Sequence, residues 1–165
     1  MRRKASDIVH RATGTTSKSD EFDLGEAVYK HLNQSLVDDF KSACKSFKRE
    51  VETLEHLLAL NLGDTAVSDS RRRLERFFRE LEDVSTRLCE RSLKPTRAVV
   101  EQALLHHRGS ERLTGHDQRL IAAAFGDLSL ETVERDMAAA HASYAQLMPD
   151  APSPNPMHLP QLRRT

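Results

Sequence analysis

The fold is decided by two stretches of sequence, LVDDFKSACKSFKREVETLEHLLALNL at residues 36–62 and LERFFRELEDVSTRL at residues 74–88. In both stretches, apolar residues recur at steps of three or four. This spacing places their side chains on one face of an α-helix, and that face must be buried. The first set is Leu36, Phe40, Ala43, Phe47, Val51, Leu54, Leu58 and Leu62, and the second is Leu74, Phe77, Leu81, Val84 and Leu88. We therefore predict two long helices that pack against each other.

The short segment between the stretches predicts an antiparallel hairpin. Gly63 is expected to cap the first helix at its C-terminus, because glycine adopts the left-handed conformation without strain. Thr65, Ser68 and Asp69 offer side-chain oxygens that could cap the second helix. With the turn centred between Thr65 and Ala66, the apolar pairs are Leu58 with Leu74, Leu54 with Phe77, Val51 with Leu81, Phe47 with Val84 and Ala43 with Leu88. The same alignment pairs charges across the hairpin: Glu55 with Arg76, Glu52 with Arg79, Lys48 with Asp83 and Lys41 with Glu90.

Shorter helices are predicted on either side of the hairpin. A helical pattern begins near Phe22 and can break at Asn33–Ser35. Pro95 is expected to end the second hairpin helix near Leu93, because the residue before a proline disfavours the α conformation. It also suits the first turn of the next helix. Three further helices are expected to end at Gly109, at Gly126 and before Pro149, and Thr114 and Asp117 resemble a capping box at the start of the second of these. The predicted fold is all-α, a long antiparallel helical hairpin packed with two or three shorter C-terminal helices.

Composition divides the chain into three segments. Residues 1–20 are rich in Arg, Ser and Thr and are interpreted as a flexible basic arm, with a mitochondrial presequence or a secretion leader as the alternatives. Residues 21–148 are predicted to form a single helical bundle domain. Residues 149–165 carry repeated prolines and are interpreted as a Pro-rich disordered tail.

The overall composition limits the class of protein. With 165 residues, 30% of them charged, and only 5% aromatic, the chain suits one helical domain better than a β-sandwich. The formal net charge of zero gives no global attraction to nucleic acid or to an anionic membrane. Two cysteines are too few for a disulfide-stapled secreted fold, so an intracellular, most simply cytoplasmic, location is expected. No apolar run reaches the length of a membrane span.

The candidate partner-binding residues are basic or apolar. Arg71, Arg72 and Arg73 form the densest basic run and could bind phosphates or an acidic partner. Cross-hairpin ion pairing is the competing interpretation of this basic region. Leu57, Leu60 and Phe78 lie off the predicted apolar stripes, so they would either receive the shorter helices or bind a partner.

We assign no residue of the sequence to catalysis, cofactor binding or metal binding. It has no phosphate-binding loop and no nucleophile elbow. His106, His107 and His116 are near one another in sequence, but adjacent positions on a helix point about 100° apart. We interpret these histidines as surface or helix-end residues, and Cys44 and Cys89 as packing residues.

Two functions are compatible with these features. The first is a non-enzymatic helical adaptor or structural subunit that binds protein partners, including copies of itself. The alternative is a small nucleic-acid-binding protein that uses a helix-turn-helix-like segment at residues 118–140. Glu131, Glu134 and Asp136 in that segment would repel phosphates, which favours the adaptor.

Overall fold

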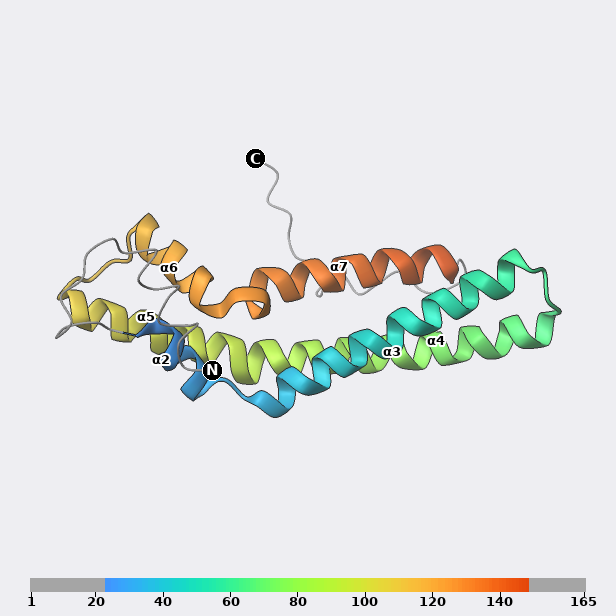
Figure 1. The fold of residues 1–165 in the computed structure, drawn as a ribbon, viewed down its shortest axis with the longest axis horizontal. Coiled ribbons are helices and arrows are strands. Elements are labelled where there is room, and N and C mark those ends of the chain that lie inside the picture. Colours follow the sequence, from blue (N-terminus) through green and yellow to red (C-terminus); the bar gives the residue numbers. More distant parts are fainter. Residues whose placement is uncertain (1–22, 149–165) are drawn as a thin grey trace. The chain divides into compact units, whose positions relative to one another are not determined.

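The computed structural model describes residues 23–148 (Figure 1). Within this range the secondary structure is helical and contains no strand. In chain order the elements are α2 (Leu24–His31), α3 (Gln34–Ala59), α4 (Asp64–Leu88), the π-helix η1 (Cys89–Leu93), α5 (Lys94–Arg108), α6 (Gly115–Phe125), the 3₁₀-helix η2 (Gly126–Leu128) and α7 (Leu130–Leu147). The all-α prediction is confirmed. The predicted arm at 1–20 and the predicted tail at 149–165 lie outside the described residues, as does Phe22.

The described residues divide into two compact units. The first contains residues 23–34 and 88–130, and thus α2, η1, α5 and α6. The second contains residues 35–87 and 131–148, and thus nearly all of α3, α4 and α7. Each unit buries apolar residues of its own.

In the second unit, α3 and α4 form the predicted helical hairpin (Figure 1). The apolar stripe of α3 is buried from Leu36 to Leu54 apart from half-buried Val51, and that of α4 from Leu74 to Leu88 apart from half-buried Phe77. Beyond Leu54 the outcome differs from the prediction, because Leu58 and Leu62 are exposed.

The turn of the hairpin is built around Asn61, and the predicted role of Gly63 as the helix cap is wrong. Asn61 has a φ of 50°, in the left-handed region that Asn tolerates better than most residues. The N–H of Asn61 donates to the carbonyl of Leu58 at 3.2 Å, and the N–H of Leu62 donates to the carbonyl of Leu57 at 3.4 Å. These two bonds are those of a Schellman motif. Helix α4 can then begin at Asp64, ahead of the three predicted N-cap residues.

Because the turn comes earlier, the predicted register of the hairpin is wrong. Phe47 contacts Phe78, with ring centroids 5.8 Å apart, where the prediction paired Phe47 with Val84. Glu50 bonds to Ser70 and Arg73, about two to three turns away from its predicted neighbours on α4.

Several residues of the predicted cross-hairpin charge pairs form ion pairs within their own helical segment. Arg79 pairs with Glu75 at 2.7 Å and Arg87 with Asp83 at 3.1 Å, while Lys94 pairs with Glu90. Each of these pairs spans four residues, a spacing that brings side chains together on a helix surface.

Helix α7 packs on Phe78. The prediction placed Phe77 on the buried stripe and Phe78 off it, but Phe78 is the more deeply buried of the two. Phe78 is only 5% exposed, and its ring stacks on Tyr144 of α7 with centroids 4.1 Å apart. His141 of α7 approaches the same ring edge-on, at 5.0 Å. Phe77 is half-buried, and the guanidinium of Arg76 lies 5.1 Å from its ring centre. Because α4 must face both α3 and α7, its buried surface is centred on Phe78.

A boundary between elements falls after Leu93, as predicted, but the backbone stays helical through Pro95 instead of being interrupted there. Residues Cys89–Leu93 form one π-helical turn, in which the N–H of Lys94 donates to the carbonyl of Cys89. Pro95 then occupies the first turn of α5. Proline lacks an N–H and clashes with the carbonyl four residues before it, and we attribute its tolerance here to the wider π turn.

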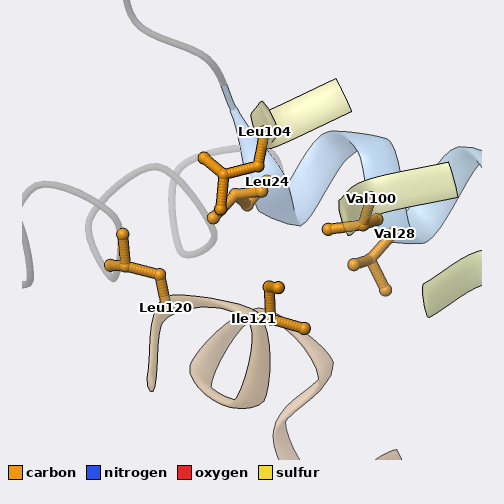
Figure 2. Packing of buried hydrophobic residues seen from close by; sticks show 6 residues of the cluster. All are labelled: Leu24, Val28, Val100, Leu104, Leu120 and Ile121. Atoms are coloured by element: carbon orange, nitrogen blue, oxygen red, sulfur yellow. The ribbon is translucent and has the colours of Figure 1, made fainter. Parts of the chain in front are cut away.

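The first unit encloses a small core between α2, α5 and α6. Its buried members are Leu24 and Val28 from α2, Val100 and Leu104 from α5, and Leu120 and Ile121 from α6 (Figure 2). Two hydrogen bonds fix the end of α2. The hydroxyl of Thr96 donates to the carbonyl of His31 at 3.0 Å, and the N–H of Asn33 donates to the hydroxyl of Ser92 at 2.9 Å.

The helix ends of the first unit follow the sequence prediction. Gly109, with a φ of 62°, ends α5. Thr114 and Asp117 form the predicted capping box at the start of α6, and Gly126 ends that helix.

Candidate functional site

One end of the hairpin carries a cluster of leucines, which we name the tip surface: Leu57, Leu58, Leu60 and Leu62. Leu58, Leu60 and Leu62 are 41%, 53% and 49% exposed, and Leu57 is half-buried. Leu57 and Leu58 belong to the last turn of α3, and the other two belong to the connection to α4. Single exposed leucines are ordinary, but a contiguous group within six residues of sequence marks a surface suited to a partner.

The exposure of the tip surface follows from the sequence of the opposing helix. The first turns of α4 carry Asp64, Thr65, Ser68 and Asp69, all of which are exposed. The buried apolar stripe of α4 begins only at Leu74. In the observed register, α4 therefore offers the end of α3 a largely polar neighbour.

An open pocket of about 390 Å³ lies along the start of α4. Its wall is one face of α4, where residues follow one another at helical spacing, and Met148 at the end of α7 completes it. The α4 residues are Asp64, Val67, Ser68, Arg71, Arg72 and Glu75. The pocket begins two residues after Leu62 in the sequence, so its lining continues from the tip surface along the chain.

The structure separates the three arginines of the predicted basic run. Arg71 and Arg72 line the pocket, whereas Arg73 points to α3. The Nε of Arg71 is buried and has no hydrogen-bond partner among residues 23–148. Arg72 is 4.0 Å from Asp69, and both side chains are largely exposed, so this pair is weak.

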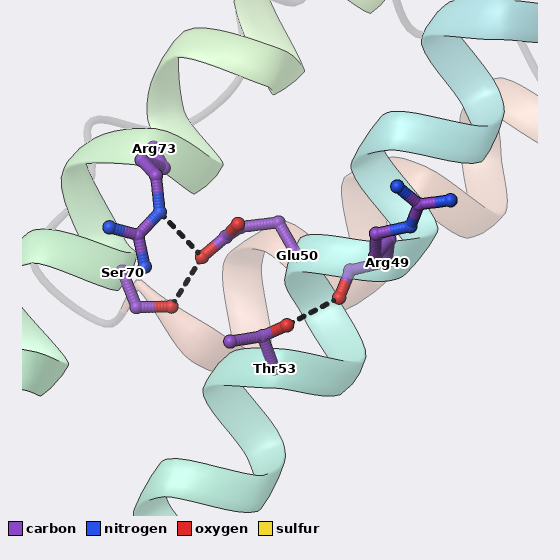
Figure 3. A network of polar contacts seen from close by, with 5 residues as sticks. All are labelled: Arg49, Glu50, Thr53, Ser70 and Arg73. Carbon is purple, nitrogen blue, oxygen red and sulfur yellow. Dashed lines mark hydrogen bonds and ion pairs between the residues drawn. The ribbon is translucent and has the colours of Figure 1, made fainter.

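A polar network that the sequence analysis missed joins the two helices of the hairpin (Figure 3). Oε1 of Glu50 accepts hydrogen bonds from the hydroxyl of Ser70 at 2.7 Å and from Nε of Arg73 at 3.2 Å. Glu50 is 8% exposed and Ser70 is fully buried. The available signal was the position of Glu50, three residues after Phe47 and four before Leu54, on the edge of the apolar stripe. This network accounts for Arg73 as a structural residue.

A second, mostly apolar groove of about 220 Å³ lies among α3, α4 and α7. The small side chains of Ala139, Ala140 and Ser143 line it from α7, opposite Phe47 and Val51 of α3. We interpret the groove as imperfect packing of the three helices.

Cys44 lines this groove, and its environment argues against a reactive thiol. Burial raises the pKa of the Cys44 thiol to about 11, with a further increase from Asp136 and an opposing decrease from Lys48. A thiol with this pKa is uncharged near neutral pH, and the thiolate is the nucleophilic form.

The histidine-rich region does not form a metal site within the described part of the chain. His106, His107 and His116 are exposed, and no group of three or more His, Cys, Asp or Glu side chains between residues 23 and 148 could hold a metal ion. Asp117 is fully buried, where its carboxylate accepts from the N–H of Thr114 and lies 3.0 Å from Nη2 of Arg108. It therefore has a structural role at the helix start.

The helix-turn-helix-like segment at 118–140 spans parts of both units. Helix α6 belongs to the first unit and almost all of α7 to the second. A DNA-binding helix-turn-helix presents its two helices as one packed motif. Arg135, the basic residue of its second helix nearest the turn, lies 3.8 Å from Asp136.

The predicted partner-binding residues thus have different environments. Leu57 and Leu60 belong to the tip surface, and Arg71 and Arg72 line the adjoining pocket. Arg73 bonds to Glu50, and Phe78 is buried beneath α7. Sequence reasoning omitted Leu58 and Leu62 because it assigned them to the buried stripe.

Comparisons with protein-family models, with curated proteins and with solved structures found no match to this chain. None of the helices within residues 23–148 is long and apolar enough to cross a membrane. The function is therefore argued from the surface of the molecule alone.

Proposed function

We propose that this protein is a non-enzymatic helical adaptor or structural subunit, and that it binds a protein partner through the tip surface. The observation that carries the proposal is the exposure of Leu58, Leu60 and Leu62, within five residues of sequence, at the end of a hairpin whose remaining stripe residues are buried or half-buried. Fully burying one leucine is worth about 1.5–3 kcal/mol, so a partner that covers three half-exposed leucines gains appreciable affinity.

The rest of the described surface supports binding over catalysis. Cys44 has a raised pKa, Asp117 and Glu50 are held in structural contacts, and Phe78 belongs to the core. The partner class that best fits the tip surface is a protein with an apolar face. We expect a cytoplasmic setting, in keeping with the two free cysteines.

A comparative capture experiment tests the proposal. The full chain and the variant L58S/L60S/L62S are immobilised, and the proteins retained from the native source are quantified by mass spectrometry. A specific partner should be retained by the wild type and reduced at least about tenfold by the variant, because 1.4 kcal/mol of lost binding energy corresponds to that factor.

Tyr29→Ser provides the matched control, because Tyr29 is 77% exposed and belongs to α2. This variant should retain the partner as the wild type does. The proposal fails if the tip variant and the wild type retain the same proteins in the same amounts. Salt-dependent retention of all three proteins on duplex DNA would instead support the nucleic-acid alternative.

A further inference from the structure

The pocket at the start of α4 has a chemistry that the tip surface lacks. We propose that Arg71 and Arg72 bind a carboxylate side chain of the protein segment that covers the tip surface. This inference rests on the proposed function and specifies its partner, an acidic segment that also carries apolar side chains.

The first reason to expect a bound carboxylate is the environment of Arg71. Its Nε is buried, yet it has no hydrogen-bond partner among the described residues. Leaving a buried donor without an acceptor is destabilising. A carboxylate from a partner can reach this donor if the side chain of Arg71 turns toward the pocket that it lines, and guanidinium–carboxylate hydrogen bonds are among the stronger ones in proteins.

The charges around the pocket supply the second reason. Glu75 could neutralise Arg71, but its carboxylate is paired with Arg79 at 2.7 Å. Asp69 lies 4.0 Å from Arg72, and the side chains are 54% and 80% exposed, so solvent screens their attraction. The pocket is therefore lined by two guanidinium groups whose positive charges are only weakly neutralised by neighbouring carboxylates.

The remaining lining favours a protein carboxylate over a nucleic-acid phosphate. Asp64 and Glu75 lie in the same pocket and would repel a polyanion. Val67 and Met148 provide apolar contacts beside the arginines, and the tip surface follows directly in the sequence. A mixed acidic and apolar peptide complements the two arginines together with Val67 and Met148, whereas a phosphate backbone complements only the two arginines.

Side-chain NMR of the full chain tests the proposal directly. The probes are the capped pentapeptide LEALE and its uncharged analogue LQALQ, titrated to millimolar concentration at low salt. The Nε–Hε signal of Arg71 should move with increasing LEALE and should move less than a tenth as far with LQALQ. The methyl signal of Met148 should follow it, because Met148 lines the same pocket.

Variants separate the role of charge from the role of folding. Arg71→Gln should weaken LEALE binding at least about tenfold, read from the Met148 methyl, while leaving far-UV circular dichroism unchanged. Arg119→Gln is the matched control, because Arg119 is an exposed arginine of α6, and it should leave binding unchanged. Equal responses to the two peptides, no response to LEALE, or a larger response to a single-stranded oligonucleotide than to LEALE would each overturn the proposal.

The experiment also distinguishes this inference from the proposed function. If LEALE fails while L58S/L60S/L62S still abolishes capture of a partner, then the carboxylate proposal is wrong and the adaptor proposal stands. If LEALE binds at Arg71 while capture is insensitive to the leucines, then the pocket binds carboxylates but the tip surface is not the docking site.

Discussion

Glu50 illustrates, at the scale of single residues, how a polar side chain can specify a helix pairing. Its carboxylate is buried and accepts from both Ser70 and Arg73. The side chain of Arg73 stays 44% exposed, but removing the Glu50 carboxylate from water costs energy that the pair only partly regains, so such a pair is a weak source of stability. A shift of the hairpin register would leave Glu50 buried without its donors. We therefore interpret the network as a device that selects one register over its neighbours.

The raised pKa of the Cys44 thiol predicts how the stability of the protein depends on pH. Burial raises the pKa of its thiol to about 11 from an ordinary value of 9.0. Since a thiol becomes charged on losing its proton, the folded state binds more protons than the unfolded state between these two values. The resulting contribution to stability is complete below pH 9.0 and is lost as the pH rises toward about 11.

The measurement is the rate at which iodoacetamide modifies Cys44 at pH 9, resolved by peptide mass spectrometry. The same residue in urea serves as the control. We expect modification of the folded protein to be slower by about fivefold or more, because the thiolate fraction is about 50-fold lower at pH 9, whereas each thiolate is only about six- to tenfold more nucleophilic. Equal rates in the two states would show that the environment of Cys44 does not suppress its ionisation.

At the scale of elements, the Asn61 turn makes a prediction that separates the observed hairpin from the one expected from sequence. Asn61 has a φ of 50°, whereas Gly63 does not have a positive φ. Asn61→Val should lower the free energy of unfolding by about 1–2 kcal/mol, because a β-branched residue is strained in the left-handed region. Asn61→Gly should be neutral or slightly stabilising. Urea denaturation monitored by circular dichroism measures both.

Gly63→Ala is the matched control, because a Cβ at Gly63 would meet nothing within 4 Å. It should change the free energy of unfolding by less than about 0.5 kcal/mol. A larger loss for Gly63→Ala than for Asn61→Val would contradict the observed turn and restore the one predicted from sequence.

The same turn explains why the positions of the long helices could be predicted from the sequence and the register between them could not. The periodicity of residues 36–62 and 74–88 is strong enough to predict both long helices, and Gly109 and the Thr114–Asp117 box predict helix ends correctly. Register could not be predicted, because it depends on whether Asn61 or Gly63 adopts the left-handed conformation, and both residue types can. The first-turn position of Pro95 in α5 was predicted, but the uninterrupted helical backbone was not, because local rules do not anticipate a π turn ahead of it.

At the scale of the whole molecule, the candidate site depended on the register and was therefore only partly predictable. Leu57, Leu60, Arg71 and Arg72 were selected from the sequence because they lie off the apolar stripes or in a basic run. Leu58 and Leu62 were missed because both were assigned to the buried apolar stripe. Phe78 receives α7, which is one of the two roles expected of it, but no local feature shows which of the two it would take. Contacts that join distant segments decide which apolar residues remain exposed.

The division into two units predicts how the molecule opens. Ile121 is 1% exposed in the core shared by α2, α5 and α6, and Leu54 is fully buried in the hairpin. Replacing either by alanine should cost about 2–5 kcal/mol of stability. The free energy of local opening varies between cooperative substructures of a protein. The two substitutions should therefore accelerate hydrogen exchange at different backbone amides.

Hydrogen exchange measured by mass spectrometry on the full chain tests this prediction. Ile121→Ala should accelerate exchange mainly in peptides from α2, α5 and α6, and Leu54→Ala mainly in peptides from α3, α4 and α7. Each variant serves as the control for the other, because both remove a large apolar side chain from a buried site. If the two variants accelerate exchange in the same peptides to the same extent, then the units open as one cooperative structure. Since each core is assembled from segments far apart in the sequence, distinct patterns would instead show that tertiary packing, rather than chain connectivity, sets the boundaries of cooperative opening.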